Sequence, residues 1–318
     1  MSDWYWEGGS LRCRLLDRWQ HCFLTKDQNP PTDALFAKQV HGNRCVYGLL
    51  VRQAHQPQDC QAHQPQDCQA HQPQDYQAHQ PQGYQAHQPQ GYQAHQQPQD
   101  YQAHQPQDYQ AHQQPQEYLD QGHQTHQTQE EDQQPHKNTQ AEDRLEADGL
   151  WLDRQVAKSI WVCSADCVPI LVGDRKRGTV AAVHSGWRGT AAKILPIMVA
   201  TLVEQGSNLT DLLFALGPAI SGEKYQVGQE VADRVLATLT DPVGVLPDEL
   251  PGHCRLDLRL VQQQQLLELG IPPEHIAIAP YCTYQNPHLF YSYRRSCHTQ
   301  DGQTGKVQWS GITPWSPD

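Results

Sequence analysis

Three short motifs place reactive side chains beside glycine or at a break between apolar runs. They are KQVHGNR (38–44) with His41, SADCVP (164–169) with Cys167, and AVHSGWRGT (182–190) with His184. A catalytic zinc ion takes three protein ligands, cysteine and histidine among them, and keeps a fourth position for water. The same side chains also suit a nucleophile pair, with Cys167 as the thiolate and His184 as its base. A buried cysteine beside two hydrogen-bonded core histidines is the third possibility, and the residue types leave all three open.

The turn that follows His184 adds a candidate anion site. Gly186 and Gly189 let a ligand approach the backbone, and Arg188 stands where the next helix begins with unpaired N–H groups. Arg294, in FYSYRRSC, is a second candidate anion contact. The alternative is that Arg294 and Arg295 are both exposed to solvent and bind nothing. Cys282 is either a further substrate contact or a small core residue. The aromatic residues nearby predict either the wall of a pocket for a flat base or a packed terminal sheet; they are Tyr281, Tyr284, Phe290, Tyr291 and Tyr293.

The elements that position these motifs are short apolar runs mixed with helical patterns. The apolar runs predict one or two strands within 11–25. They also predict single strands at 44–51, 159–165, 168–174, 179–184, 212–216 and 275–279. Apolar residues at helical spacing predict helices from the Gly189 loop to Gly206, over 223–239 and over 258–269. Pro196 falls inside the first helix and predicts a kink or a later start. Because strands and helices follow no strict βαβ order, we expect an α+β layered domain with mixed sheets.

A repetitive segment interrupts this domain. Residues 53–118 are eight copies of a unit such as QAHQPQDC, and the bias towards Gln, His and Pro continues to 140. This segment has too few apolar side chains to offset the entropy of ordering, so we expect a disordered insertion. Its imidazoles also suit a weak metal buffer. Residues 1–52 and 141–318 together have the length of one domain.

Composition limits the possible partners and the compartment. The chain has a net charge of −12, and most of the excess acid lies in the repetitive segment, so no basic face predicts nucleic-acid binding. No apolar stretch is long enough to span a membrane, and the amino-terminal residues lack the pattern of a signal peptide. None of the ten cysteines forms a C-x-x-C pair. We therefore expect reduced thiols and a cytoplasmic protein, with no protein partner indicated.

Taken together and in order, the motifs resemble the laccase-domain family, long called polyphenol oxidases and similar to purine nucleoside phosphorylases. The motifs are QVHG (39–42), ADGLW (147–151), SADCVPIL (164–171), AAVHSGWRGTAAKIL (181–195), GPAIS (217–221), CTY (282–284) and FYSYRR (290–295). The resemblance covers 1–52 and 141–318 and implies a single layered α/β/β/α domain. The chain departs from the family pattern at three places. They are Lys224, where the family frequently has cysteine, the short 27–38 segment, and SCHTQ (296–300).

The resemblance also implies an activity. It implies zinc, or copper as has been proposed, held by His41, Cys167 and His184. It further implies phosphorolysis of adenosine, inosine and S-methyl-5'-thioadenosine, accompanied by adenosine deamination. Cys167, His184 and Arg188 would then be catalytic, and Arg188, Gly186, Cys282 and Arg294 would contact nucleoside or phosphate.

Other functions remain open at this point. The older interpretation of the family is copper-dependent phenol oxidation, but seven histidines outside 53–140 are few for a multicopper site. A metal-independent hydrolase using Cys167 and His184 is a further alternative. The last is a non-enzymatic scaffold for the repetitive segment, against which the intact reactive residues argue.

Overall fold

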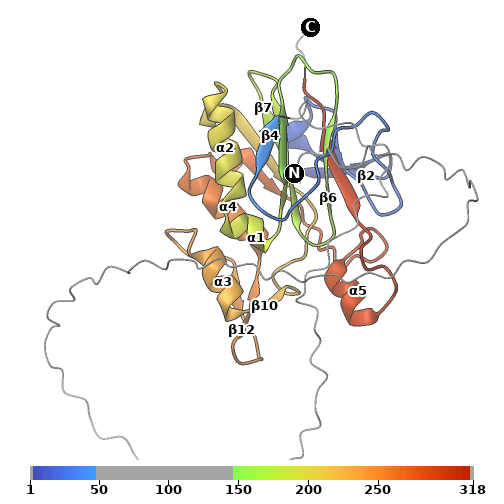
Figure 1. The fold of residues 1–318 in the computed structure, drawn as a ribbon, viewed down its shortest axis with the longest axis vertical. Coiled ribbons are helices and arrows are strands. Elements are labelled where there is room, and N and C mark those ends of the chain that lie inside the picture. The colour runs from blue at the N-terminus through green and yellow to red at the C-terminus, as the bar shows by residue number, and fades with distance from the viewer. Residues whose placement is uncertain (1–2, 48–145, 316–318) are drawn as a thin grey trace, which may run out of the picture. The chain divides into compact units, whose positions relative to one another are not determined.

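The computed structural model describes residues 3–47 and 146–315, which lie in one compact unit. Two sheets pack face to face, and helices cover the outer face of the larger one (Figure 1). The mixed α+β class expected from the sequence is confirmed. The predicted insertion at 53–140 lies outside the described residues.

The larger sheet has six strands and carries the motifs with Cys167 and His184. In spatial order its strands are β13 (Ile276–Ile278), β9 (Leu212–Leu216), β7 (Val168–Asp174), β8 (Val180–Ser185), β5 (Gly149–Leu152) and β4 (Cys45–Tyr47). The β13–β9 and β4–β5 pairs are parallel, and the other pairs are antiparallel. Every residue of β7 and β8 is buried, which explains why both strands are nearly continuous apolar runs.

The smaller sheet has five antiparallel strands and combines the first three strands of the described chain with its last strand and β6. Its order is β1 (Trp4–Glu7), β2 (Ser10–Cys13), β3 (His21–Phe23), β14 (Gln308–Ile312) and β6 (Ile160–Ser164). Thus the predicted 11–25 region does contain two strands, separated by a short 3₁₀ helix, η1 (Arg14–Leu16). Leu11 and Ile160 of this sheet meet Leu150 and Leu171 of the larger sheet in a buried layer. Burial of such side chains contributes about 1.5–3 kcal/mol each, so this layer joins the two sheets.

Helices α1 (Trp187–Ala191), α2 (Ile194–Glu204) and α4 (Leu258–Glu268) pack on the outer face of the larger sheet. The helix predicted after Gly189 is therefore two helices, separated where Lys193 adopts a left-handed φ of 57°. Pro196 lies in the first turn of α2, where its missing N–H has no helical partner to lose. The later start predicted from this proline is confirmed. Two further 3₁₀ helices are η4 (Leu209–Asp211) and η5 (Pro273–His275).

One predicted helix was wrong in its bounds. The helix predicted over 223–239 is a strand, β10 (Gln226–Gly228), followed by a shorter helix, α3 (Gln229–Leu236). In chain order β11 (Val245–Pro247) and β12 (His253–Leu256) complete a small sheet with β10. The four-residue spacing of valines continues across both elements, so periodicity alone hid the boundary at Gly228.

The aromatic residues near the end of the chain do not form a terminal sheet, because only Tyr293 lies in a helix and the other four lie in turns or irregular segments before it. Ser292 is the N-cap of helix α5 (Tyr293–Thr299), and its hydroxyl accepts the Arg295 N–H at 3.1 Å. In the described part of the chain, no helix is long and apolar enough to cross a membrane. The eight cysteines described there are all free thiols.

Candidate functional site

The β7–β8 hairpin brings Cys167 beside His184. Its register pairs Pro169 with His184 and Val168 with Ser185, so Cys167 continues the hairpin opposite Gly186. A Cβ atom at Gly186 would lie 2.7 Å from the Cys167 sulfur, closer than such atoms approach in real proteins. The glycine predicted to admit a ligand therefore makes room for the thiol itself.

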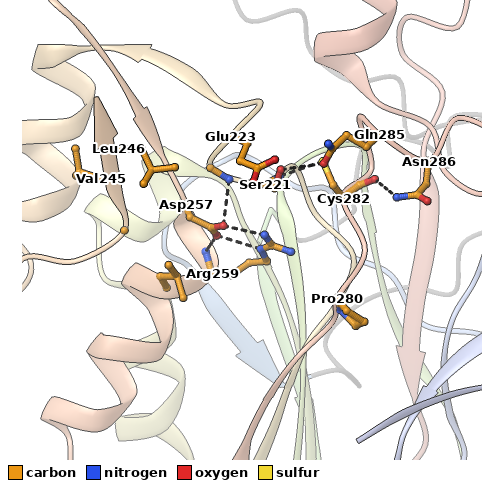
Figure 2. A pocket seen from close by; sticks show the side chains of 13 residues that line it. Ser221, Glu223, Val245, Leu246, Asp257, Arg259, Pro280, Cys282, Gln285 and Asn286 are labelled. Atoms are coloured by element: carbon orange, nitrogen blue, oxygen red, sulfur yellow. Dashed lines mark hydrogen bonds and ion pairs between the residues drawn. The ribbon is translucent and has the colours of Figure 1, made fainter. Parts of the chain in front are cut away.

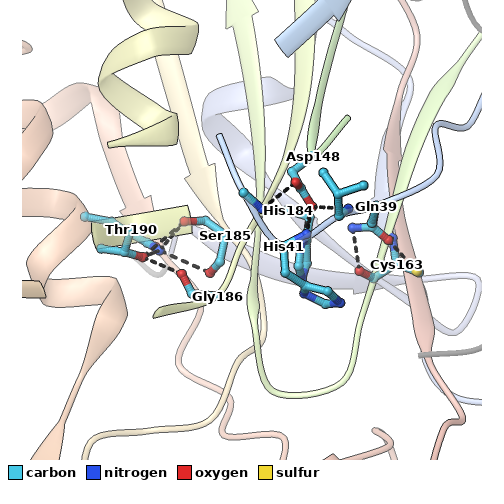
Figure 3. A network of polar contacts seen from close by, with 11 residues as sticks. Gln39, His41, Asp148, Cys163, His184, Ser185, Gly186 and Thr190 are labelled. Carbon is cyan, nitrogen blue, oxygen red and sulfur yellow. Dashed lines mark hydrogen bonds and ion pairs between the residues drawn. The ribbon is translucent and has the colours of Figure 1, made fainter. Parts of the chain in front are cut away.

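A buried carboxylate orients His184. Asp148 is 1% exposed, and its Oδ1 receives the His184 Nδ1–H at 3.2 Å. The same carboxylate accepts the N–H groups of Val40, His41 and Gly42 at 3.1, 2.9 and 2.7 Å. One side chain thus fixes both the imidazole tautomer and the loop that carries the second histidine (Figure 3).

The loop places the two histidine rings in contact. His41 has a left-handed φ of 56°, and its ring meets that of His184 edge to face, with 4.9 Å between centroids. His184 also hydrogen-bonds the Cys167 sulfur. His184 is therefore the member that contacts both of the others.

Charges around His184 favour its protonated form. Burial alone would lower its pKa, but the Cys167 sulfur and the Asp148 carboxylate raise the pKa to about 9. Burial would likewise raise the pKa of Asp148, yet the bonds from His184, Gly42 and His41 hold it below its ordinary value. The site is thus a coupled acid–base cluster inside the molecule.

Cys167, His41 and His184 form a candidate donor set for a metal ion. Across residues 3–47 and 146–315, no three His, Cys, Asp or Glu side chains are grouped closely enough to hold an ion. The chemistry of the set nevertheless fits zinc, because cysteine and histidine are zinc ligands. A histidine that binds zinc through one ring nitrogen usually hydrogen-bonds a carboxylate through the other, and Nδ1 of His184 has this contact with Asp148.

A buried amide network supports the strand end from behind. Gln262 of α4 is 0% exposed, and its Nε2 donates to the Ser185 hydroxyl at 3.0 Å and to the Thr190 hydroxyl at 2.9 Å. Gln265, one turn later, donates to the Thr190 carbonyl at 3.1 Å. Helix α4 therefore holds both the residue directly after His184 and helix α1. Figure 3 shows Ser185 and Thr190 in this network.

Arginines and a tyrosine gather near Cys167. The Arg294 guanidinium lies 5.3 Å from the ring centre of Tyr225 and donates to the Gln226 carbonyl at 2.8 Å. Burial and the nearby Cys167 sulfur raise the pKa of Tyr225, while Arg294 and Arg188 oppose that rise. Arg188 is itself exposed and lies over the neighbouring Trp187 ring. The two predicted anion contacts therefore share one electrostatic environment with Cys167.

Arg295 and Cys282 have other surroundings. The Arg295 guanidinium donates to the carbonyls of Thr283, Tyr284 and Phe290, so it fastens the loop before α5. Cys282 is buried and lines a cavity of about 450 Å³ beside the Asp257–Arg259 ion pair (Figure 2). Neither a predicted metal ligand nor a predicted anion-binding arginine lines that cavity.

Sequence reasoning missed three residues that organise the site. Asp148 stands in the ADGLW motif, where a carboxylate at the start of an apolar strand was the available signal. Tyr225 was visible only as a residue of YQVG, and Gln262 looked like one of four successive polar residues on a surface helix. Their roles depend on partners far away in the sequence.

A family model matches more than half of the chain. Residues 85–312 match the family described as multi-copper polyphenol oxidoreductase laccase. The matched range includes Cys167, His184, Arg188 and Arg294, and it begins inside the repetitive segment.

Curated relatives carry the name purine nucleoside phosphorylase. The protein slr1573 of Synechocystis sp. is 46% identical over 188 residues, which cover 53% of this chain and 68% of the relative. YlmD of Bacillus subtilis is 35% identical over 147 residues, covering 46% of this chain and 51% of the relative. The chain thus spans about half to two thirds of the length of these relatives.

A solved structure shows the same fold. The crystal structure of YlmD from Geobacillus stearothermophilus aligns with a TM-score of 0.50 and 32% identity, covering 55% of this chain and 63% of that one.

Proposed function

The chain belongs to the multi-copper polyphenol oxidoreductase laccase family, and we propose that it is a purine nucleoside phosphorylase. Its substrates are inorganic phosphate and adenosine, inosine or S-methyl-5'-thioadenosine, and its products are the free base and the sugar 1-phosphate. Adenosine deamination is a second activity of the same site. The names of the curated relatives support the first activity.

The observation that carries the proposal is the fixed position of His184 between Asp148 and Cys167, with His41 against its ring. His41, Cys167 and His184 are the residues that would hold zinc. Bound zinc supplies a Lewis acid that polarises an oxygen atom or activates water. Asp148 accepts the Nδ1–H of His184, so Nε2 is the ring nitrogen that would bind zinc, once its own proton is displaced.

The two arginines serve the other reactant. Phosphorolysis requires a phosphate oxygen to approach the sugar C1′ as the bond to the base breaks. Arg188 and Arg294 bind that phosphate and balance its charge, and Arg294 holds it in position for attack. Arg294 is suited to this because the Gln226 carbonyl and the Tyr225 ring hold its side chain.

Composition argues against the oxidase that the family description names. A multicopper oxidase needs a mononuclear site and a cluster supplied by many histidines. Outside 53–140 the chain has seven, at 21, 41, 184, 253, 275, 288 and 298. His21 is already engaged with backbone groups on both ring nitrogens. Phenol oxidation is therefore not the activity we propose.

The test uses the full chain with adenosine, inosine and S-methyl-5'-thioadenosine, each with and without phosphate, and separates the products by chromatography. His41→Ala, Cys167→Ala and His184→Ala should each lose phosphate-dependent base release. Each should also contain about one zinc less per chain than wild type, since one catalytic ion needs all three ligands. His288→Ala, at an exposed histidine, is the matched control and should change neither quantity.

Two outcomes would contradict the proposal. Phosphate-dependent activity that persists in a variant with the lower zinc content would remove the metal from the reaction. Hydrolysis that survives a chelator but stops with a thiol alkylator would point instead to Cys167 as a nucleophile and His184 as its base.

A further inference from the structure

The residue before Cys167 has an unusual backbone and a buried carboxylate. Asp166 adopts a left-handed φ of 92°, a region that favours glycine, and it is 8% exposed. Its conformation makes the chain turn between β6 and β7 so that Cys167 faces Gly186 and His184. Its backbone carbonyl also accepts the Ile220 N–H at 3.1 Å.

The Asp166 side chain reaches the opposite part of the site. Its Oδ1 accepts the Thr283 hydroxyl at 2.6 Å, and its Oδ2 accepts the Arg294 N–H at 2.7 Å. The Ser292 hydroxyl adds a further hydrogen bond. The carboxylate therefore caps the first turn of α5, the turn that carries Arg294.

Two features of Asp166 thus act on two functional groups at once. The backbone sets the position of Cys167 directly before β7, and the carboxylate sets the position of Arg294 in the first turn of α5. We infer that Asp166 is a positioning residue that holds the Cys167 side of the site and the Arg294 side at a fixed separation. This inference rests on the proposed function for the roles of Cys167 and Arg294, but the positional link can be measured without that function.

Aspartate suits this task because it is short. Asparagine and aspartate tolerate the left-handed region better than other non-glycine residues. A carboxylate also offers two oxygens, one for Thr283 and one for Arg294, whereas an amide offers one oxygen and a competing N–H donor. Asp166→Asn therefore keeps the backbone and weakens the link, while Asp166→Ala disturbs both.

The first experiment measures the two sides separately in the full chain, as purified and after treatment with a chelator. Cys167 is alkylated with iodoacetamide and Arg294 is modified with phenylglyoxal, and both rates are followed by peptide mapping. Asp166→Asn should change both rates severalfold, and Asp166→Ala should change them more. Asp211→Asn is the matched control, because Asp211 is also a buried aspartate but contacts Arg175, Lys176 and Asn208 instead.

The second experiment separates positioning from simple loss of folded protein. A displaced Arg294 should raise the KM for phosphate and lower kcat in Asp166→Asn, by about 100-fold together in kcat/KM, since a misplacement of about 1 Å can cost that much. Loss of folded protein alone would lower the apparent kcat and leave KM unchanged.

The outcomes decide the inference independently of the activity. Modification rates in Asp166→Asn and Asp166→Ala that match those of Asp211→Asn would overturn it. If both rates change but the wild-type chain releases no base from any nucleoside, the positioning role stands and the proposed function fails.

Discussion

Two histidines in this molecule are buried equally, at 3% exposure each, but their surroundings differ. His21 lies in β3 of the smaller sheet, where its Nε2 accepts the Cys13 N–H at 2.9 Å and its Nδ1 donates to the Trp19 carbonyl at 2.9 Å. His184 lies in β8 of the larger sheet, between the Asp148 carboxylate and the Cys167 thiol.

The pKa values of these histidines shift in opposite directions. Burial lowers the pKa of His21, because its backbone partners compensate only part of the lost hydration. The pKa of His184 is raised to about 9, because ionisable partners outweigh the same burial. Burial therefore does not distinguish a chemical histidine from a structural one, whereas the type of partner does.

The largest expected effect comes from replacing each ring by the same apolar side chain. His184→Leu should lower kcat/KM for phosphorolysis about a thousandfold, or about 4 kcal/mol, because the proposed zinc site loses one of its three protein ligands. His21→Leu should leave the activity of folded protein unchanged but lower the free energy of unfolding by about 1–3 kcal/mol, because two buried backbone groups lose their partners. Kinetics and chemical denaturation of both variants check this. Equal losses of activity would erase the distinction.

The next effect should come from Asp148. Asp148→Asn keeps the shape of the side chain but replaces an acceptor oxygen with a donor that faces N–H groups. We expect activity or zinc affinity to fall about 10–100-fold, the usual cost of losing the carboxylate behind a ligating histidine. Metal titration and kinetics measure this. Activity within twofold of wild type would mean that the carboxylate does not distinguish His184 from His21.

A smaller effect should separate two glutamines on one helix. Gln262→Leu removes the donor to Ser185, which follows His184, whereas Gln265→Leu removes the donor to the carbonyl of Thr190. Gln262→Leu should lower kcat about tenfold. This corresponds to about 1.4 kcal/mol, the net contribution of one hydrogen bond that aligns the site. Gln265→Leu should lower only the thermal midpoint. If the two variants have the same kcat in steady-state assays, the network stabilises the fold but does not position His184.

The smallest effect is a pH dependence of stability due to His21. Its pKa is lowered in the folded chain, so unfolding takes up a proton at low pH. The stabilisation is present above the ordinary histidine pKa of about 6.5 and is lost as pH falls below it. Between about pH 8 and pH 5, the free energy of unfolding measured with denaturant should therefore fall less in His21→Leu than in wild type. An unchanged pH profile would show that His21 titrates normally.

Local patterns were sufficient to predict much of this molecule. The apolar runs of β6, β7 and β8 are each contiguous in sequence, and placing Cys167 and His184 at strand ends correctly brought them together. The resemblance to a family supplied the expected layers. These features need no knowledge of distant partners.

Long-range features were not predictable in the same way. Asp148 gains its role only because β5 pairs with β8 and the 40–42 loop folds over it. The left-handed φ of Asp166 is compensated by Thr283 and Arg294, more than a hundred residues later. A single aspartate in a sequence carries no signal of such partners.

The position of β14 has a consequence for how the chain reaches this fold. This strand follows every other described element in chain order, yet it lies inside the smaller sheet between β3 and β6. During synthesis the edges of β3 and β6 therefore remain open until β14 emerges, which makes folding slow and leaves strand edges exposed to aggregation. A ribosome-bound chain stalled before residue 308 should need chaperone protection that a chain released after β14 does not.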